Sequence, residues 1–300
     1  MTTSETFDRH MERIDQGERL SADEIRALAA APDILPLGML ADSLRRRMHG
    51  TRVTYIRVAT CGFDRSFADA VPPSAREIRI TGAPDTVGVA KTAIEQARAI
   101  AGERTVSGFS WGDVERLAEH GGEHLSDVLL AWRDAGLDAI ADLPIDLMGE
   151  PAIAIDRLTA AGFQQLSLSI AKAPAEPRTE LLLRVAQLQD EFACIQAIDP
   201  LPSVLNPLRP TTGYQDVKMV AVARLAAANV PTIQVDWLRY GPKLAQVALT
   251  FGADDVSGVS PSDDAPEGRR RAPLEEIKRN IQAAGFEAAE RDGRFTVVAS

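Results

Sequence analysis

The sequence contains little cysteine, with only Cys61 and Cys194 among 300 residues. The two lie far apart, and there is no CxxC pair and no even-numbered set from which a disulfide framework is built. Proteins of reducing compartments keep such isolated thiols free. We therefore expect two free, packed thiols and no disulfide.

Basic residues are outnumbered, with 33 Lys and Arg against 43 Asp and Glu, which gives a net charge of −10. A negative chain without a basic stripe repels phosphate backbones, so no nucleic-acid partner is expected. No run of eighteen apolar residues occurs, and the first twenty residues contain no apolar segment typical of a signal peptide. These features predict a cytoplasmic protein that does not enter a membrane.

Common catalytic motifs are also missing. The chain has no GxxxxGK[ST], no GxGxxG after a strand, no HExxH and no GxSxG, which removes support for the reactions that these motifs serve. His120 and His124 are four residues apart, but Gly121 and Gly122 between them make a shared helical face improbable. No metal site is predicted.

Short runs rich in β-branched residues alternate along the chain with amphipathic helical segments. This order predicts parallel strands joined by right-handed crossovers, and eight strands favour a (β/α)8 TIM-type barrel over an open doubly wound sheet. We expect a helical lead-in over residues 1–50, a single barrel domain over 51–300, and a solvated loop at 260–273. The predicted strands are 53–60, 77–82, 105–110, 139–143, 164–170, 194–199, 232–237 and 255–260.

The polar residues that alternate with apolar ones in these strands indicate a polar barrel interior. The outward face of each strand must be apolar to pack on helices, so the polar alternates should point inward. Two interpretations remain open. Arg57 and Arg79 can pair with Glu77, Asp142 or Asp236 in a closed network, or the strand ends can form a site for a polar small molecule. The candidate ligand-binding residues are Arg57, Arg79, Thr81, Ser107, Asp142, Ser169, Gln196, Gln234 and Asp236.

Several segments resemble the radical S-adenosylmethionine enzymes of the futalosine route to menaquinone, with the deazaflavin-forming FO synthase as a related group. The resemblance covers about residues 20–295 and is most specific around Trp237, Gly241–Gln246 and Gly252–Asp255. It implies a radical-SAM-like barrel. The segments that carry it are LPLGMLADSLRRRMHGTRVTYI (35–56), VAQLQDE (185–191), IDPLPSVLNPL (198–208), residues 217–258 and AAGFEAAERDGRF (283–295).

The sequence departs from that family immediately after the first strand. The family has a CxxxCxxC loop there, whose three thiolates hold a 4Fe–4S cluster that binds S-adenosylmethionine, whereas this chain has Cys61 alone. Cluster ligation takes three or four sulfurs, so no cluster is expected here. The Gly-Gly turn with which the family meets the cofactor amine is replaced by Thr81-Gly82-Ala83-Pro84. We therefore expect neither cofactor.

Two functions fit these observations. The first is a pseudoenzyme, a cluster-less barrel protein that serves as accessory partner to an active radical enzyme of menaquinone synthesis. The second is a non-radical enzyme or binding protein that takes a nucleoside-derived ligand in its lumen. In that case Asp142 or Asp236 is the candidate general base, and Arg57 or Arg79 stabilises negative charge. Whether the chain is an enzyme stays open at this point.

Overall fold

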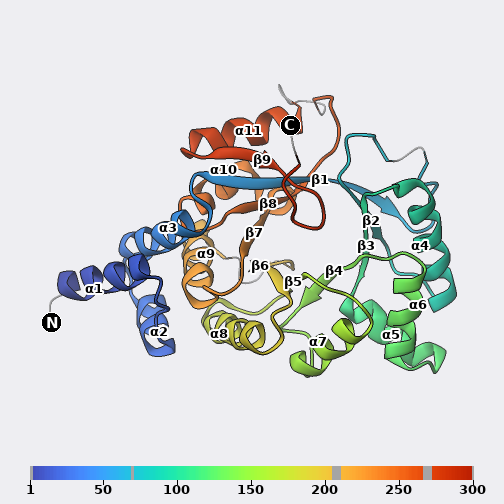
Figure 1. Ribbon diagram of the computed structural model, residues 1–300, viewed down its shortest axis with the longest axis horizontal. Coiled ribbons are helices and arrows are strands. Elements are labelled where there is room, and N and C mark those ends of the chain that lie inside the picture. The colour runs from blue at the N-terminus through green and yellow to red at the C-terminus, as the bar shows by residue number, and fades with distance from the viewer. Residues whose placement is uncertain (1–2, 69–70, 205–210, 266–271, 299–300) are drawn as a thin grey trace.

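Eight parallel strands form a closed barrel, and each corresponds to one of the eight predicted β-branched runs. The computed structural model describes residues 3–68, 71–204, 211–265 and 272–298, and Figure 1 shows the helices arranged around the strands. The predicted (β/α)8 TIM-type barrel is confirmed. The strands are β1 (Arg52–Gly62), β2 (Glu77–Thr81), β3 (Thr105–Ser110), β4 (Ala139–Pro144), β5 (Leu166–Ile170), β6 (Ile195–Pro202), β7 (Thr232–Asp236) and β8 (Asp255–Val259).

Strand β1 closes the barrel because it is long enough to pair on both sides. Its second half, from Val58 to Gly62, pairs with β2, and its first half pairs with β8. The first half also pairs, through Arg52–Tyr55, with a ninth parallel strand, β9 (Glu287–Glu290). That strand was not predicted, because its sequence EAAE contains no β-branched residue.

Helices cover the outside of the barrel between successive strands. Several begin at well-formed caps: Ser110, for example, ends β3 and accepts a hydrogen bond from the backbone N–H of Asp113 at the start of α5. Of the loop predicted at 260–273, residues 266–271 lie outside the described residues, and 260–265 form no helix or strand. The helices are α4 (Val87–Ala101), α5 (Trp111–Gly121), α6 (Leu125–Asp134), α7 (Pro151–Ala160), α8 (Ala175–Phe192), α9 (Gly213–Ala226), α10 (Trp237–Leu249) and α11 (Pro273–Ala283).

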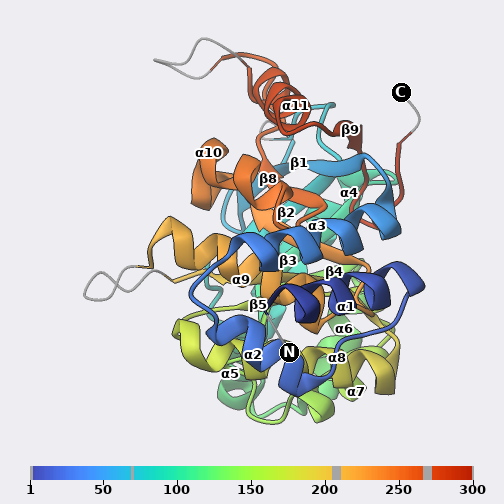
Figure 2. The same cartoon turned by 90° about the vertical axis from the view of Figure 1, so that its left-hand side faces the viewer.

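The lead-in consists of α1 (Thr3–Gln16), α2 (Ala22–Ala30) and α3 (Leu35–His49). In Figure 2 these blue helices lie in front of the barrel, and α3 packs on α9 while α2 contacts both α8 and α9. His10 is 4% exposed, and His49 makes a 2.9 Å hydrogen-bond contact with the carbonyl of Pro231. The neighbouring lead-in helices bury His10, and the docking of α3 on the barrel leaves His49 partly buried.

No helix in the described parts of the chain is long and apolar enough to cross a membrane.

Candidate functional site

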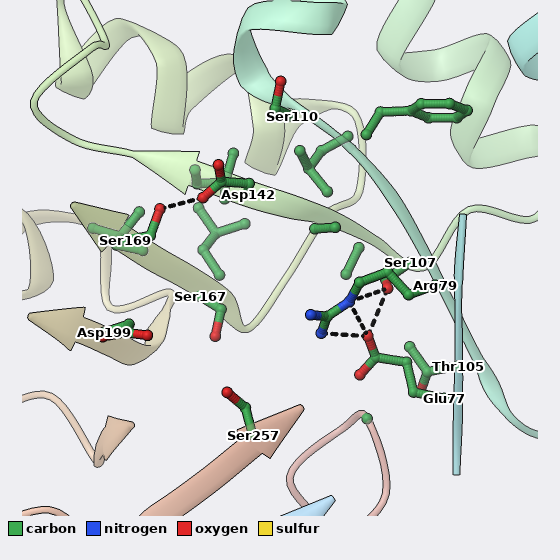
Figure 3. A pocket seen from close by; sticks show the side chains of 18 of the residues that line it. Glu77, Arg79, Thr105, Ser107, Ser110, Asp142, Ser167, Ser169, Asp199 and Ser257 are labelled. Atoms are coloured by element: carbon green, nitrogen blue, oxygen red, sulfur yellow. Dashed lines mark hydrogen bonds and ion pairs between the residues drawn. The ribbon is translucent and has the colours of Figure 1, made fainter. Parts of the chain in front are cut away.

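A cavity of about 350 Å³ lies inside the barrel. Side chains from β2 to β8, and from the segment that follows β9, line it. Figure 3 shows Asp142, Ser169 and Asp199 on one side of the cavity and Glu77, Arg79 and Ser107 on the other. A barrel that serves only as scaffold fills this space with branched apolar side chains. Here polar groups from opposite walls face a common space.

Most of the predicted site residues line this cavity. Two do not, and their placement in the lumen was a wrong prediction. Gln196 lies in a separate cleft with Gln164 and Cys194, where its Nε2 donates to Thr232 Oγ1 at 3.4 Å. The other predicted residues line the cavity, and whether they bind a ligand stays a prediction. They are Arg79, Thr81, Ser107, Asp142, Ser169, Gln234 and Asp236.

Arg57 is the second misplaced residue. Its Nε donates to Glu290 Oε1 at 2.5 Å, and its Nη1 lies 3.6 Å from Asp263. Thr54, three residues away and so on the opposite face of β1, bonds to Asp255 instead. The cause is β9, because Glu290 of that unpredicted strand offers Arg57 a carboxylate away from the lumen.

A buried ion pair forms one wall of the cavity. Arg79 donates to Glu77 Oε1 from Nη2 at 2.7 Å and from Nε at 3.0 Å, and Ser107 Oγ donates to the same oxygen at 2.6 Å. Burial of Glu77 opposes its ionisation, but Arg79, Ser107 and Arg291 together outweigh burial and hold its pKa below the ordinary value. This pair is part of the closed network that the sequence left open as an alternative.

A second buried ion pair joins Asp255 of β8 to Arg291, which follows β9. Arg291 Nε and Nη2 donate to the two oxygens of Asp255 at 2.6 and 2.8 Å. Gln234 Nε2 donates to Asp255 Oδ2 at 2.7 Å. The two charged side chains are 0% and 3% exposed. Each charge is thus bonded to the other, as burial requires.

The C-terminal ends of β4, β6 and β7 carry three carboxylates. Asp142 accepts a 2.5 Å hydrogen bond from Ser169 Oγ. Asp236 caps α10 by accepting from the backbone N–H of Arg239 at 2.9 Å, and its second oxygen lies 3.6 Å from the Arg239 guanidinium. The third carboxylate, Asp199, accepts from the backbone N–H of Leu201 at 3.0 Å and has no other hydrogen bond to the described residues.

Asp199 has an unusual acidity. Burial raises its pKa to about 7, and the carboxylates of Asp236 and Asp142 act in the same direction, against the Leu201 N–H and Arg239. A group that exchanges its proton near neutrality inside a cavity can serve as general acid or base.

Asp199, Arg239, Ser257 and Arg291 line the cavity and were missed from the sequence. One signal was available for Asp199, since a carboxylate inside the apolar strand IDPLP has to be buried or functional. No such signal marked Arg291, because its position depends on β9.

The two cysteines cannot serve as a cluster site. Cys61 lies near the C-terminal end of β1 and is 3% exposed, and burial raises the pKa of its thiol. Cys194 immediately precedes β6, so it lies at the opposite end of the barrel. A cluster needs at least three thiolates at one place. Among the described residues, no group of three or more His, Cys, Asp and Glu side chains is arranged to hold a metal ion.

The loop after β1 is packed with aromatic side chains where the resemblance implies cluster ligands. Phe67 is 3% exposed. Phe63 lies against Gly82 so closely that a Cβ atom added to Gly82 would be 2.6 Å from its ring. The phenylalanine thus covers the turn after β2 that meets the cofactor amine in the resembling family. The residues present do not fit the cluster, and the covered turn does not favour S-adenosylmethionine.

Solved structures of similar fold agree with the TIM-type barrel. The [FeFe]-hydrogenase maturase HydG from Carboxydothermus hydrogenoformans superimposes with a TM-score of 0.68, at 13% identity, over 97% of this chain and 81% of that one. Methylornithine synthase (PylB) does so with a TM-score of 0.67, at 15% identity, over 93% of this chain and 97% of that one.

Sequence comparison narrows the relationship. The family model for the CofH/MqnC C-terminal region matches residues 201–299. Aminodeoxyfutalosine synthase of Thermus thermophilus is 24% identical over 96% of this chain and 94% of its own length. Cyclic dehypoxanthine futalosine synthase of Halalkalibacterium halodurans is 21% identical over 98% of this chain and 95% of its own length. The chain is therefore similar to aminodeoxyfutalosine synthase and cyclic dehypoxanthine futalosine synthase, in line with the resemblance seen in its motifs.

Proposed function

We propose that this chain is a cluster-less, cytoplasmic relative of the futalosine-route enzymes that binds a small, polar, nucleoside-derived ligand in its barrel without radical chemistry. One observation carries the proposal: a polar cavity of about 350 Å³ lies in a barrel whose two cysteine thiols are at opposite ends. Small-molecule sites have volumes of roughly 300–1,000 Å³, so the cavity suits a nucleoside-sized ligand.

The cavity walls supply groups for such a ligand. Hydroxyl and carboxylate groups such as Ser167, Ser257 and Asp142 suit the hydroxyls of a ribose-like moiety, and both ion pairs supply fixed charges deeper in the barrel. For acid–base chemistry, Asp142 and Asp236 remain candidates for the general base. Of the two arginines predicted to stabilise negative charge, only Arg79 reaches the cavity.

Anaerobic reconstitution with iron and sulfide tests the loss of the radical centre. We expect no stoichiometric cluster in the visible absorption spectrum, because no place in the fold gathers three thiolates. A stoichiometric cluster that survives gel filtration and is lost in Cys61→Ala, but not in Cys194→Ala, would show that the radical centre is retained.

Titration calorimetry with futalosine and adenosine tests the binding site. We expect binding that Ser167→Phe abolishes, because the new ring occupies the cavity that Ser167 lines. Ser126→Phe on the exposed face of α6 is the matched control and should bind normally. Absence of heat and of any thermal shift with every nucleoside tried contradicts the proposal.

A second candidate function is the accessory role beside an active radical enzyme. It is favoured by large apolar side chains exposed beyond the C-terminal ends of β4, β6 and β7: Leu147 is 48%, Val204 58% and Leu238 81% exposed. Exposed apolar side chains gathered at one place mark contact surfaces.

Binding of this chain to a purified aminodeoxyfutalosine synthase from the same cell tests the accessory role. We expect Leu238→Glu to weaken the complex at least tenfold and Leu130→Glu, on α6, to leave it unchanged. Both leucines are exposed, so neither variant should disturb folding. No complex at micromolar concentrations counts against this role.

A further inference from the structure

The charges that line the cavity are balanced deep in the barrel but not at its C-terminal end. Glu77 is bonded to Arg79, and Asp255 to Arg291. At the other end lie Asp142, Asp199 and Asp236, here called the acidic edge, next to Arg239; Arg79, which is bonded to Glu77, also acts on Asp142 and Asp236. The Arg239 guanidinium lies 3.6 Å from Asp236. The acidic edge therefore contains more carboxyl groups than cations.

Asp199 is the member of the acidic edge with one carboxyl oxygen for which the described residues supply no hydrogen bond. It is 8% exposed, and among the described residues its only hydrogen bond is the one that Oδ1 accepts from Leu201. In Figure 3 its carboxyl group points into the cavity. A buried carboxylate with one oxygen unbonded is costly, so the group requires a proton, or a ligand, on that oxygen.

Among the described residues, no cation forms an ion pair or hydrogen bond with Asp199. The ionisable groups that act on Asp199 are Asp142 from β4, Asp236 from β7, and Arg239 and Tyr240 from α10. Tyr240 donates its hydroxyl proton to the carbonyl of Pro202 at 2.6 Å, so it is not directed at Asp199. Without a ligand, burial and the two neighbouring carboxylates raise the pKa of Asp199 to about 7, so its neutral, protonated form dominates below that pH.

We propose that the acidic edge receives a cationic nitrogen of the ligand and that Asp199 releases its proton when this nitrogen binds. The inference rests on the proposed function and specifies its ligand class as an amine-bearing nucleoside. The step is balanced: a neutral carboxylic acid and an ammonium group give a carboxylate–ammonium pair, and one proton passes to solvent. No oxidant or further reactant is needed.

A cation fits this edge better than the alternatives. An anionic group would meet three carboxyl groups, of which only Asp236 has an arginine of the described residues within 4 Å, and would be repelled. A neutral hydroxyl could bond to Asp199 but would not compensate the cost of ionising it. A cation favours the charged form of Asp199 more strongly than a neutral donor does, and this linkage makes binding depend on pH.

Calorimetry with 5′-amino-5′-deoxyadenosine, and with adenosine as its neutral counterpart, tests the inference. Titrations in two buffers of different ionisation enthalpy give the protons released. For the amine we expect nearly one proton released per site at about pH 6 and almost none at about pH 8, with binding about tenfold tighter at the higher pH. Adenosine should release none and bind with an affinity that hardly changes.

The variant Asp199→Asn keeps the shape of the side chain and removes its titration. We expect it to abolish the proton release and the pH dependence of amine binding, whereas Asp156→Asn, on the exposed face of α7, should preserve both. Infrared spectra of the wild type provide a readout that does not need the variant. A carboxylic-acid carbonyl band should be present at about pH 6 and disappear when the amine binds.

The outcomes separate the two proposals. If adenosine binds but the amine shows no proton release and no pH dependence, the acidic edge is not a cation site and the inference is wrong, while the binding function stands. Proton release that persists in Asp199→Asn also overturns the inference. If neither compound binds, the proposed function fails, and the inference fails with it.

Discussion

At the scale of one residue, the buried carboxyl group of Asp199 lowers the stability of the folded protein. In the unfolded chain its carboxyl group ionises near its usual value, but in the fold burial first, and then Asp236 and Asp142, raise its pKa to about 7. The unfolded state therefore loses this proton at lower pH than the folded state does. The contribution of protonated Asp199 to the free energy of unfolding is therefore full below about pH 4. It is lost as the pH rises through about 7.

Replacing Asp199 with Asn should therefore stabilise the protein at alkaline pH. We expect the free energy of unfolding to rise on the order of 2–4 kcal/mol at about pH 8, because the amide need not ionise, and to change little at about pH 4.5. Urea unfolding of both proteins at the two pH values measures the difference. An equal effect at both values would mean that Asp199 does not titrate abnormally.

At the scale of elements, β9 and the residues after it close one end of the barrel. Arg291, Gly293 and Phe295 line the cavity near the N-terminal end of β3. Gly293 approaches so closely that an added Cβ would lie 2.5 Å from Thr105. The Arg291 guanidinium stacks over the Phe295 ring at 3.9 Å. This closing segment, Arg291–Phe295, turns an open lumen into a pocket with one mouth.

The closing segment depends on the Arg291–Asp255 pair. We expect Arg291→Met to lower the free energy of unfolding by about 3–5 kcal/mol, because it leaves the fully buried Asp255 carboxylate without its cation. Arg294→Met is the matched control, since Arg294 is 60% exposed, and it should change stability by less than about 0.5 kcal/mol. Chemical denaturation provides the measurement, and similar effects for both variants contradict the assignment.

The elements also show the limits of sequence patterns. The eight barrel strands were predictable, because buried strands need the β-branched and apolar residues that these runs contain. Strand β9 was not, since EAAE has no such residue and pairs only because β1 extends beyond its barrel partners. Because β9 was not predicted, its residue Glu290 was not recognised as the partner of Arg57. Arg57 was therefore wrongly placed in the lumen.

At the scale of the whole molecule, the lead-in is tied to the barrel by buried polar contacts. Arg224 of α9 forms an ion pair with Asp254, and both side chains are almost completely buried. His49 of α3 lies 3.5 Å from the same aspartate. In addition, Gly38 lets α3 approach the Phe251 ring, from which an added Cβ would be 2.6 Å away.

We expect the lead-in and the barrel to unfold in one cooperative transition. Gly38→Val should lower the midpoint of that single transition by several degrees, because the new side chain collides with Phe251, whereas Ala27→Val on the exposed face of α2 should have little effect. Scanning calorimetry measures both. Two separated transitions in the wild type would show that residues 1–50 and 51–300 are independent units.

The sequence by itself determined the barrel, its family relationship and the loss of the cluster motif. These depend on local composition, on residue order and on counting thiols, none of which needs coordinates. Only the tertiary structure decided which polar side chains meet in the lumen. Separate elements supply Asp199, Arg239 and Arg291 to the cavity. Burial and the distances between these side chains set their protonation states and interactions. The alternation of polar and apolar residues along a strand predicts neither the burial of a side chain nor its distance from another charge. Both arise only when distant segments pack together.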